Sequence, residues 1–199
     1  MEVVTTPGAT VTAPADTVVN LARCRHPAVA RVAADALLRI GDCSPDLLMH
    51  TNEARHSKRG RAAARWPLST ATPVPESAFE TLSLLAIEWL GFEVPELQVS
   101  IRGADGTDYR VDCFWRSSGI VGEADGRSKY VMNEQPPEHA VWEEKLREDA
   151  LRRNVAGFAR WTWHALRYPA KLQEILRAAG VPEVRAPQWE LLRTLAAIL

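Results

Sequence analysis

The chain has 199 residues, of which 46% are hydrophobic and 25% are charged, as in ordinary globular proteins. A formal net charge of −1 excludes a general attraction to nucleic acid or membrane, so any such attraction must be local. The cysteines Cys24, Cys43 and Cys113 form no CxxC pair, which indicates reduced thiols in a cytoplasmic protein. We expect no bilayer-spanning segment, because no apolar run approaches roughly 20 residues, and no signal peptide.

The segment 1–66 predicts a small helical unit. Residues 1–15, rich in Thr, Pro, Gly and Ala, indicate an extended or loose arm. Asp16 or Thr17 is a candidate N-cap for a first helix that contains VVNLARC. Three further helices are predicted over PAVARVAADALLRI, SPDLLMHTNEA and SKRGRAAARW, because prolines stand early in two of them and a glycine follows the first.

Residues 67–75, PLSTATPVP, have the composition of a linker, and residues 76–199 then predict a different domain. ESAFETLSLLAIEWLGF predicts a helix whose Ser77 and Glu80 fit a capping box. ELQVSIR, DYRVDCFW and IVGEAD predict three strands joined by the turns GADGT and RSSG. A helix over PPEHAVWEEKLREDALRRN, a strand over GFARWTW and a helix over PAKLQEILRAAG follow. This order predicts an α/β fold.

Carboxylates occur within two of these predicted strands, where acidic residues are disfavoured. Asp112 lies in the middle of one strand, and Glu123 and Asp125 lie on one face at the end of the next. The short RSSG turn should bring Asp112 near Glu123. A hard divalent cation would relieve the repulsion between them, and Mg²⁺ (or Mn²⁺) suits carboxylate oxygens.

The motifs ESAFET, YRVDCFW, GEADGRSKY, VWEEKLRED and RWTW, in this order, resemble the PD-(D/E)xK nuclease superfamily, in its branch similar to very-short-patch-repair endonucleases. The resemblance covers about residues 75–180. It implies a restriction-endonuclease-like αβββαβ core after the helical unit. The arrangement also resembles the C-terminal half of actinobacterial abortive-infection antitoxin-like proteins, with residues 10–65 similar to their helical connector and the winged helix itself expected to be absent.

The resemblance implies roles for individual residues. Asp112 and Glu123 would match the metal-binding pair, and Glu80 the acid of the first helix. Asp125 stands where the superfamily usually has lysine, so Lys129, or Lys145 on the next helix, would supply the positive charge. The candidate catalytic residues are therefore Glu80, Asp112, Glu123, Asp125 and Lys129.

Each candidate also has a structural alternative. Glu80 can be only a capping-box residue, and Asp112 can pair with Arg110 or Arg116. Glu123 can likewise be neutralised by a basic residue. Asp125-Gly126 can be a turn, Lys129 a solvated lysine, and Lys145 a partner of Glu148 or Asp149.

A run of basic residues, RHSKRGRAAAR, contains no acid and is a candidate for phosphate contacts, although a solvated helix face is an equal alternative. The candidate nucleic-acid-binding residues are Arg55, Lys58, Arg59, Arg61, Arg65 and Arg127. The histidines have no metal-ligand spacing. The tryptophans Trp115, Trp161 and Trp163 are expected in the core.

Three functions are consistent with these features. The first is a metal-dependent DNA endonuclease that hydrolyses phosphodiester bonds, in phage defence or DNA processing. The alternative is a non-catalytic nuclease fold that binds DNA as an antitoxin-type regulator, with a protein partner in a toxin-antitoxin or defence system. The third is a protein-binding scaffold.

Overall fold

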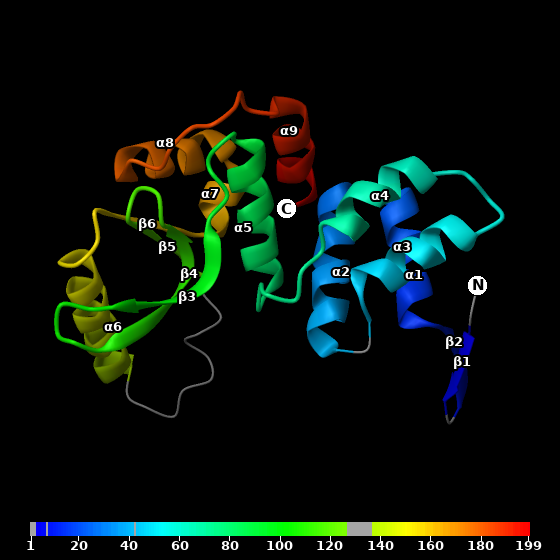
Figure 1. Cartoon of the computed structure of the whole chain (residues 1–199), viewed down its shortest axis with the longest axis horizontal. Coiled ribbons are helices and arrows are strands. Elements are labelled where there is room, and N and C mark those ends of the chain that lie inside the picture. The colour runs from blue at the N-terminus through cyan, green and yellow to red at the C-terminus, as the bar shows by residue number, and fades with distance from the viewer. Residues whose placement is uncertain (1–2, 7, 42, 127–136) are drawn as a thin grey trace. The chain divides into compact units, whose positions relative to one another are not determined.

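The computed structural model describes residues 3–6, 8–41, 43–126 and 137–199, and the chain divides into two compact units, Met1–Leu82 and Ser83–Leu199 (Figure 1). The division falls inside a helix and therefore lies later in the chain than the segment 67–75 in which a linker was predicted. Each unit has its own core and is described separately.

The first unit begins with a two-stranded antiparallel hairpin. Strands β1 (Val3–Thr6) and β2 (Ala9–Thr12) pair with Val3 opposite Thr12 and Val4 opposite Val11. Of the predicted extended or loose arm, the extended form is present, but the pairing of the two segments into a hairpin was not predicted. β-Branched Val and Thr favour strands, and Gly8 adopts the left-handed φ of 95° that a tight turn between them requires.

Four helices follow the hairpin: α1 (Pro14–Cys24), α2 (Pro27–Ile40), α3 (Pro45–Ala54) and α4 (Arg61–Ser69). The first three begin at a proline, which suits the first helical turn because its missing N–H has no helical acceptor there. Ser44 caps α3, because its Oγ accepts a hydrogen bond from Leu47 N at 3.2 Å. Neither Asp16 nor Thr17 is the N-cap, because α1 begins at Pro14 and Ala13 occupies the cap position. α4 extends to Ser69, into the predicted linker.

The helices of the first unit enclose an apolar core with one buried ion pair. Val19, Leu48 and Leu68 are among its fully buried side chains. Arg31 Nε lies 2.8 Å from Asp35 Oδ1, and both side chains are buried. Asp35 also accepts hydrogen bonds from Thr72 N and Thr81 Oγ1, so this buried carboxylate is fully supplied with donors. The pair ties α2 to the chain after α4.

The second unit is a mixed α/β structure. α5 (Ala78–Trp89) leads into it, and its four-stranded sheet has the order β3 (Glu96–Arg102), β4 (Asp108–Trp115), β5 (Ile120–Ala124), β6 (Gly157–Trp161). The first three strands form an antiparallel meander, and β6 runs parallel to β5. α6 (Pro137–Arg152) provides the crossover that a parallel pair needs. The predicted order of elements is confirmed to this point.

Three helices follow β6: α7 (Trp163–Arg167), α8 (Pro169–Ala179) and α9 (Trp189–Ile198). Only α8 was predicted from its pattern. None of the helices in the described part of the chain is both long and apolar enough to cross a membrane.

The two faces of the sheet are covered by different helices. On one face, Val111 and Val121 pack against Leu151 of α6. On the other, a Cβ added at Gly122 would lie within 3.0 Å of ring atoms of Trp115 and Trp161, which shows how closely these rings cover the strand. Trp161 Nε1 donates to Ser83 Oγ of α5 at 2.8 Å, so α5 covers this second face (Figure 1).

Two of the three expected core tryptophans are therefore confirmed. Trp115 and Trp161 are buried, whereas Trp163 is 41% exposed at the start of α7, so its assignment to the core was wrong.

Candidate functional site

The sheet brings Asp112 and Glu123 to neighbouring places on β4 and β5. Cys113 pairs with Gly122, so Asp112 and Glu123 are the next residues along the two antiparallel strands. Asp112 Oδ2 accepts a hydrogen bond from Ala124 N at 2.9 Å, which places its carboxylate beside the end of β5. The predicted juxtaposition of the two residues is present.

The hydrogen bond to Ala124 explains how a carboxylate can lie in mid-strand. The Asp112 side chain supplies the acceptor that a backbone carbonyl would otherwise provide for Ala124 N. Arg116, one of its predicted partners, pairs instead with Glu96 at 2.6 Å. Gln98, opposite Asp112 between the Leu97–Cys113 and Val99–Val111 pairs, has a φ of 54°, so the ladder is irregular at this position.

Glu123 is only 5% exposed and forms an ion pair across to α6. Arg147 Nη2 lies 2.7 Å from Glu123 Oε1 and donates a second hydrogen bond to Arg110 O at 2.9 Å. Burial raises the pKa of Glu123 to about 7, the positive charge of Arg147 opposes that rise, and Asp112 adds to it by repulsion. Glu123 is thus a desolvated carboxylate that has Arg147 as its counter-ion and a second carboxylate, Asp112, nearby.

Arg147 also belongs to a chain of alternating charges that connects α6 with β6. Glu144 Oε1 accepts from Arg147 Nη1 at 3.2 Å and from Arg160 Nη2 at 2.7 Å. Arg160 Nη1 lies 3.1 Å from Glu148 Oε2. Sequence reasoning missed Arg147 and Arg160, although the spacing of Glu144 and Arg147 by three residues was a signal that these side chains share a helix face.

Glu80 acts as a helix cap. Glu80 N donates to Ser77 Oγ at 3.2 Å, and the Glu80 carboxylate accepts from Glu76 N at 2.8 Å and from Ser77 Oγ at 2.9 Å. The predicted capping box is confirmed. Glu80 belongs to the first unit, whereas Asp112 and Glu123 belong to the second, and its role in a metal site stays a prediction.

The other catalytic candidates differ in position. Asp125 is partly exposed, and its N–H donates to Trp161 O at 2.9 Å, which continues the pairing of β5 with β6. Lys145 is exposed on α6, and among the described residues neither Glu148 nor Asp149 forms an ion pair with it. Lys129 and Arg127 lie outside the described residues.

The basic run of the first unit separates into paired and unpaired residues. Arg55 forms an ion pair with Asp16. Arg61 and Arg65 both approach Glu53, at 3.6 Å and 2.9 Å. Lys58 and Arg59 are exposed. The fold therefore does not present the whole run as a single basic face.

Asp112 and Glu123 are the residues of the second unit that would hold a metal ion. Mg²⁺ is commonly held by one or two carboxylates together with waters and phosphate oxygens, and Asp112 and Glu123 provide that number. Over residues 3–6, 8–41, 43–126 and 137–199, no group of three or more His, Cys, Asp or Glu side chains is arranged to hold a metal ion. The described residues therefore do not supply a complete set of protein ligands for a metal ion. A bound cation would also have to share the Glu123 carboxylate with Arg147.

The raised pKa of Glu123 predicts that stability falls as pH rises. The folded chain keeps this proton between the ordinary value of 4.5 and about 7, whereas the unfolded chain loses it, so the contribution is full below pH 4.5 and is lost by pH 7. We expect the free energy of unfolding to fall by up to about 3 kcal/mol over this window. Urea titrations in EDTA at several pH values measure this free energy. The free energy of unfolding of Glu123→Gln should not change over the same window. Equal pH dependence in the wild type and the variant would exclude Glu123 as the source.

Comparison with known proteins gives two curated relatives. The chain is 34% identical over 116 residues to uncharacterized protein MT2308 and to uncharacterized protein Rv2248, from two strains of Mycobacterium tuberculosis. The match covers 58% of this chain and 43% of each relative, so the chain spans less than half the length of those proteins. No family model and no solved structure matches the chain.

Proposed function

We propose that the second unit is a PD-(D/E)xK-type domain that binds a divalent cation at Asp112 and Glu123 and hydrolyses phosphodiester bonds of DNA. The observation that carries the proposal is that Asp112 binds the backbone of β5 next to the buried Glu123, whose pKa the charge of Asp112 helps to raise. The helix, three-strand meander, crossover helix and parallel fourth strand support it, because this is the element order that the resemblance implies.

In this proposal the protein side chains have separate tasks. Asp112 and Glu123 would hold the cation, which when bound would activate a water and polarise the phosphate. Asp112 is oriented by Ala124 N, and Glu123 by Arg147. Arg147 also keeps a positive charge at the site, which favours the approach of a phosphate. Asp125 would adjust the charge at the end of β5, and Lys145 or Lys129 would add a further cation.

Incubation of the wild-type chain with supercoiled plasmid tests the proposal. We expect nicked and then linear product in Mn²⁺ or Mg²⁺ and intact plasmid in EDTA. The same reactions with Ca²⁺ serve as a control, because Ca²⁺ accepts carboxylate ligands in a looser geometry than Mg²⁺. Plasmid that stays intact at micromolar protein with both catalytic cations would refute hydrolysis of DNA.

The second candidate function is DNA binding without catalysis, as in an antitoxin-type regulator. The Arg147–Glu123 ion pair favours it, because the arginine supplies the buried carboxylate with a counter-ion. If this alternative holds, the chain should slow the migration of labelled duplex DNA in a native gel, leave plasmid intact, and gain no thermal stability from Mn²⁺. Both versions of the proposal place the protein in the cytoplasm, with a protein partner from a toxin-antitoxin or phage-defence system.

A further inference from the structure

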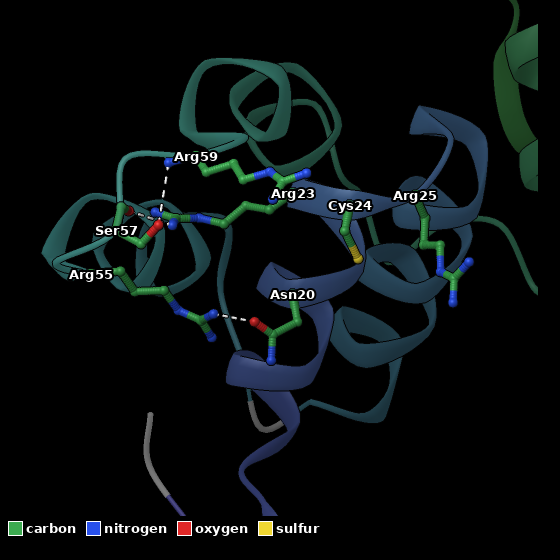
Figure 2. Close-up of a pocket in the computed structure, with 7 residues that line it drawn as sticks. All are labelled: Asn20, Arg23, Cys24, Arg25, Arg55, Ser57 and Arg59. Carbon is green, nitrogen blue, oxygen red and sulfur yellow. Dashed lines mark hydrogen bonds between the residues drawn. The ribbon is translucent and has the colours of Figure 1, made fainter.

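A pocket rich in arginine lies in the first unit and combines two residues of the basic run, Arg55 and Arg59, with residues of α1. It is an open hollow of about 800 Å³ between the end of α1 and the loop that joins α3 to α4 (Figure 2). Its lining has no acidic residue and consists of Asn20, Arg23, Cys24, Arg25, Arg55, Ser57 and Arg59. Four arginines contribute to this lining and make it a positive surface, although the side chain of Arg25 points away from the other three (Figure 2).

Two of the arginines build the pocket. Arg23 Nε donates to Asn52 Oδ1 at 2.8 Å, and its Nη1 donates to Ser57 O at 2.7 Å, so α1 is tied to the loop. Arg55 forms its ion pair with Asp16 and also donates to Asn20 Oδ1 (Figure 2). These contacts fix the lining before any ligand arrives, which lowers the entropic cost of binding.

A glycine allows the loop to approach α1 so closely. Gly60 has a φ of 70°, and a Cβ added there would lie 2.2 Å from Arg23 O. No other residue type fits this position without movement of the backbone. The pocket is therefore a consequence of the local fold and not of side chains that happen to meet on the surface.

The positive charge of the pocket is compensated only in part, because Asp16 pairs with Arg55 and Glu53 attracts Arg23. Arg55 has Asp16, but Arg23 donates to the neutral acceptors of Asn52 and Ser57. Arg25 and Arg59 are exposed, and no described residue forms a side-chain hydrogen bond or ion pair with either guanidinium. The pKa of Arg23 is lowered by burial and by repulsion from Arg55 and Arg61, and the attraction of Glu53 opposes this shift.

We propose that this pocket binds phosphate groups, with Arg25 and Arg59 as direct donors and Arg23 and Arg55 as the fixed charges behind them. Guanidinium forks match phosphate oxygens in geometry and charge better than they match other common anions. The ligand is either the backbone of a nucleic acid or a soluble phosphate ester, since both carry this group. The proposal concerns the first unit alone and holds whether or not the second unit cleaves DNA.

Cys24 offers a readout inside the pocket, because it is exposed there while Cys43 is partly buried outside the lining. The full-length chain in EDTA is alkylated with N-ethylmaleimide, and each cysteine is followed by peptide mass spectrometry. The probes are inorganic phosphate, adenosine monophosphate and a short duplex DNA. At ten times the dissociation constant, a bound ligand should slow Cys24 alkylation about tenfold and leave Cys43 unchanged.

Charge-matched variants decide whether the pocket is responsible. Arg25→Glu with Arg59→Glu should abolish the protection, whereas Arg153→Glu with Arg167→Glu, the same charge change on exposed residues of the second unit, should retain it. Protection by DNA at far lower concentration than by the small phosphates identifies a nucleic-acid backbone, and the reverse identifies a soluble ester. Absence of protection by all three probes, or equal protection in the two double variants, overturns the proposal.

Discussion

Asp112→Asn should reduce Mn²⁺-dependent plasmid nicking at least about 100-fold, equivalent to about 2.7 kcal/mol of transition-state stabilisation. Asparagine removes the negative charge that would hold the cation. Its side-chain oxygen can still accept the hydrogen bond from Ala124 N, so β4 and β5 should stay paired. The loss would therefore reflect the missing charge and not a damaged sheet. Initial rates of nicking, with circular dichroism and thermal melting of each variant, measure both properties.

Asp108→Asn is the matched control. Asp108 lies on the same strand, is exposed, and pairs with Arg102 at 3.3 Å. Its substitution removes the same charge without touching the carboxylate pair, so nicking should remain within about threefold of the wild type. An Asp112→Asn variant that nicks plasmid as fast as this control would remove Asp112 from the reaction.

Arg147→Ala should lower the free energy of unfolding by about 4 kcal/mol at pH 8 in EDTA, because it leaves the buried carboxylate of Glu123 without its counter-ion. At pH 5 the cost should be smaller. The pKa of Glu123 is already raised to about 7 with the arginine present, so the carboxyl group is protonated there and needs no cation. Urea titrations at the two pH values measure the difference.

Two comparisons isolate the ion pair. Arg152→Ala, which removes an exposed pair with Glu148 on the same helix, should cost about 1 kcal/mol or less at both pH values. The double substitution Arg147→Ala with Glu123→Gln should recover much of the stability at pH 8, because no buried charge remains. A cost of Arg147→Ala that is equal at pH 5 and pH 8, with no recovery in the double variant, would show that packing and not charge explains it.

The helices and strands of this chain follow from local signals in most places. Pro27 and Gly41 bound α2 as helix punctuation predicts, and Ser77 with Glu80 forms the predicted cap. The misses have local causes too. The N-terminal hairpin has only four residues in each strand, and α7 has five residues, too short for an apolar period to be recognised.

The candidate site could be predicted only in part. The proximity of Asp112 and Glu123 could be predicted, because side chains alternate between the two faces of a strand and a short turn joins these two strands. The pairing of Arg147 with Glu123 could not be predicted, because Arg147 lies 24 residues further along the chain and several basic residues of its helix could have faced the sheet. Likewise, Arg23 and Arg25 lie far in sequence from the basic run, so the pocket that they share with Arg55 and Arg59 was not visible in it.

The sequence by itself determined the order of the elements, the α/β class of the second unit, and the position of two carboxylates on neighbouring strands, because these depend on periodicity and turns over a few residues. Only the tertiary structure decided which charges meet. Arg147 reaches Glu123, Asp16 compensates Arg55, and Arg25 and Arg59 remain without an acidic partner among the described residues. Ion pairs form between long side chains from distant segments, and their choice depends on distances of a few ångströms that no local pattern specifies.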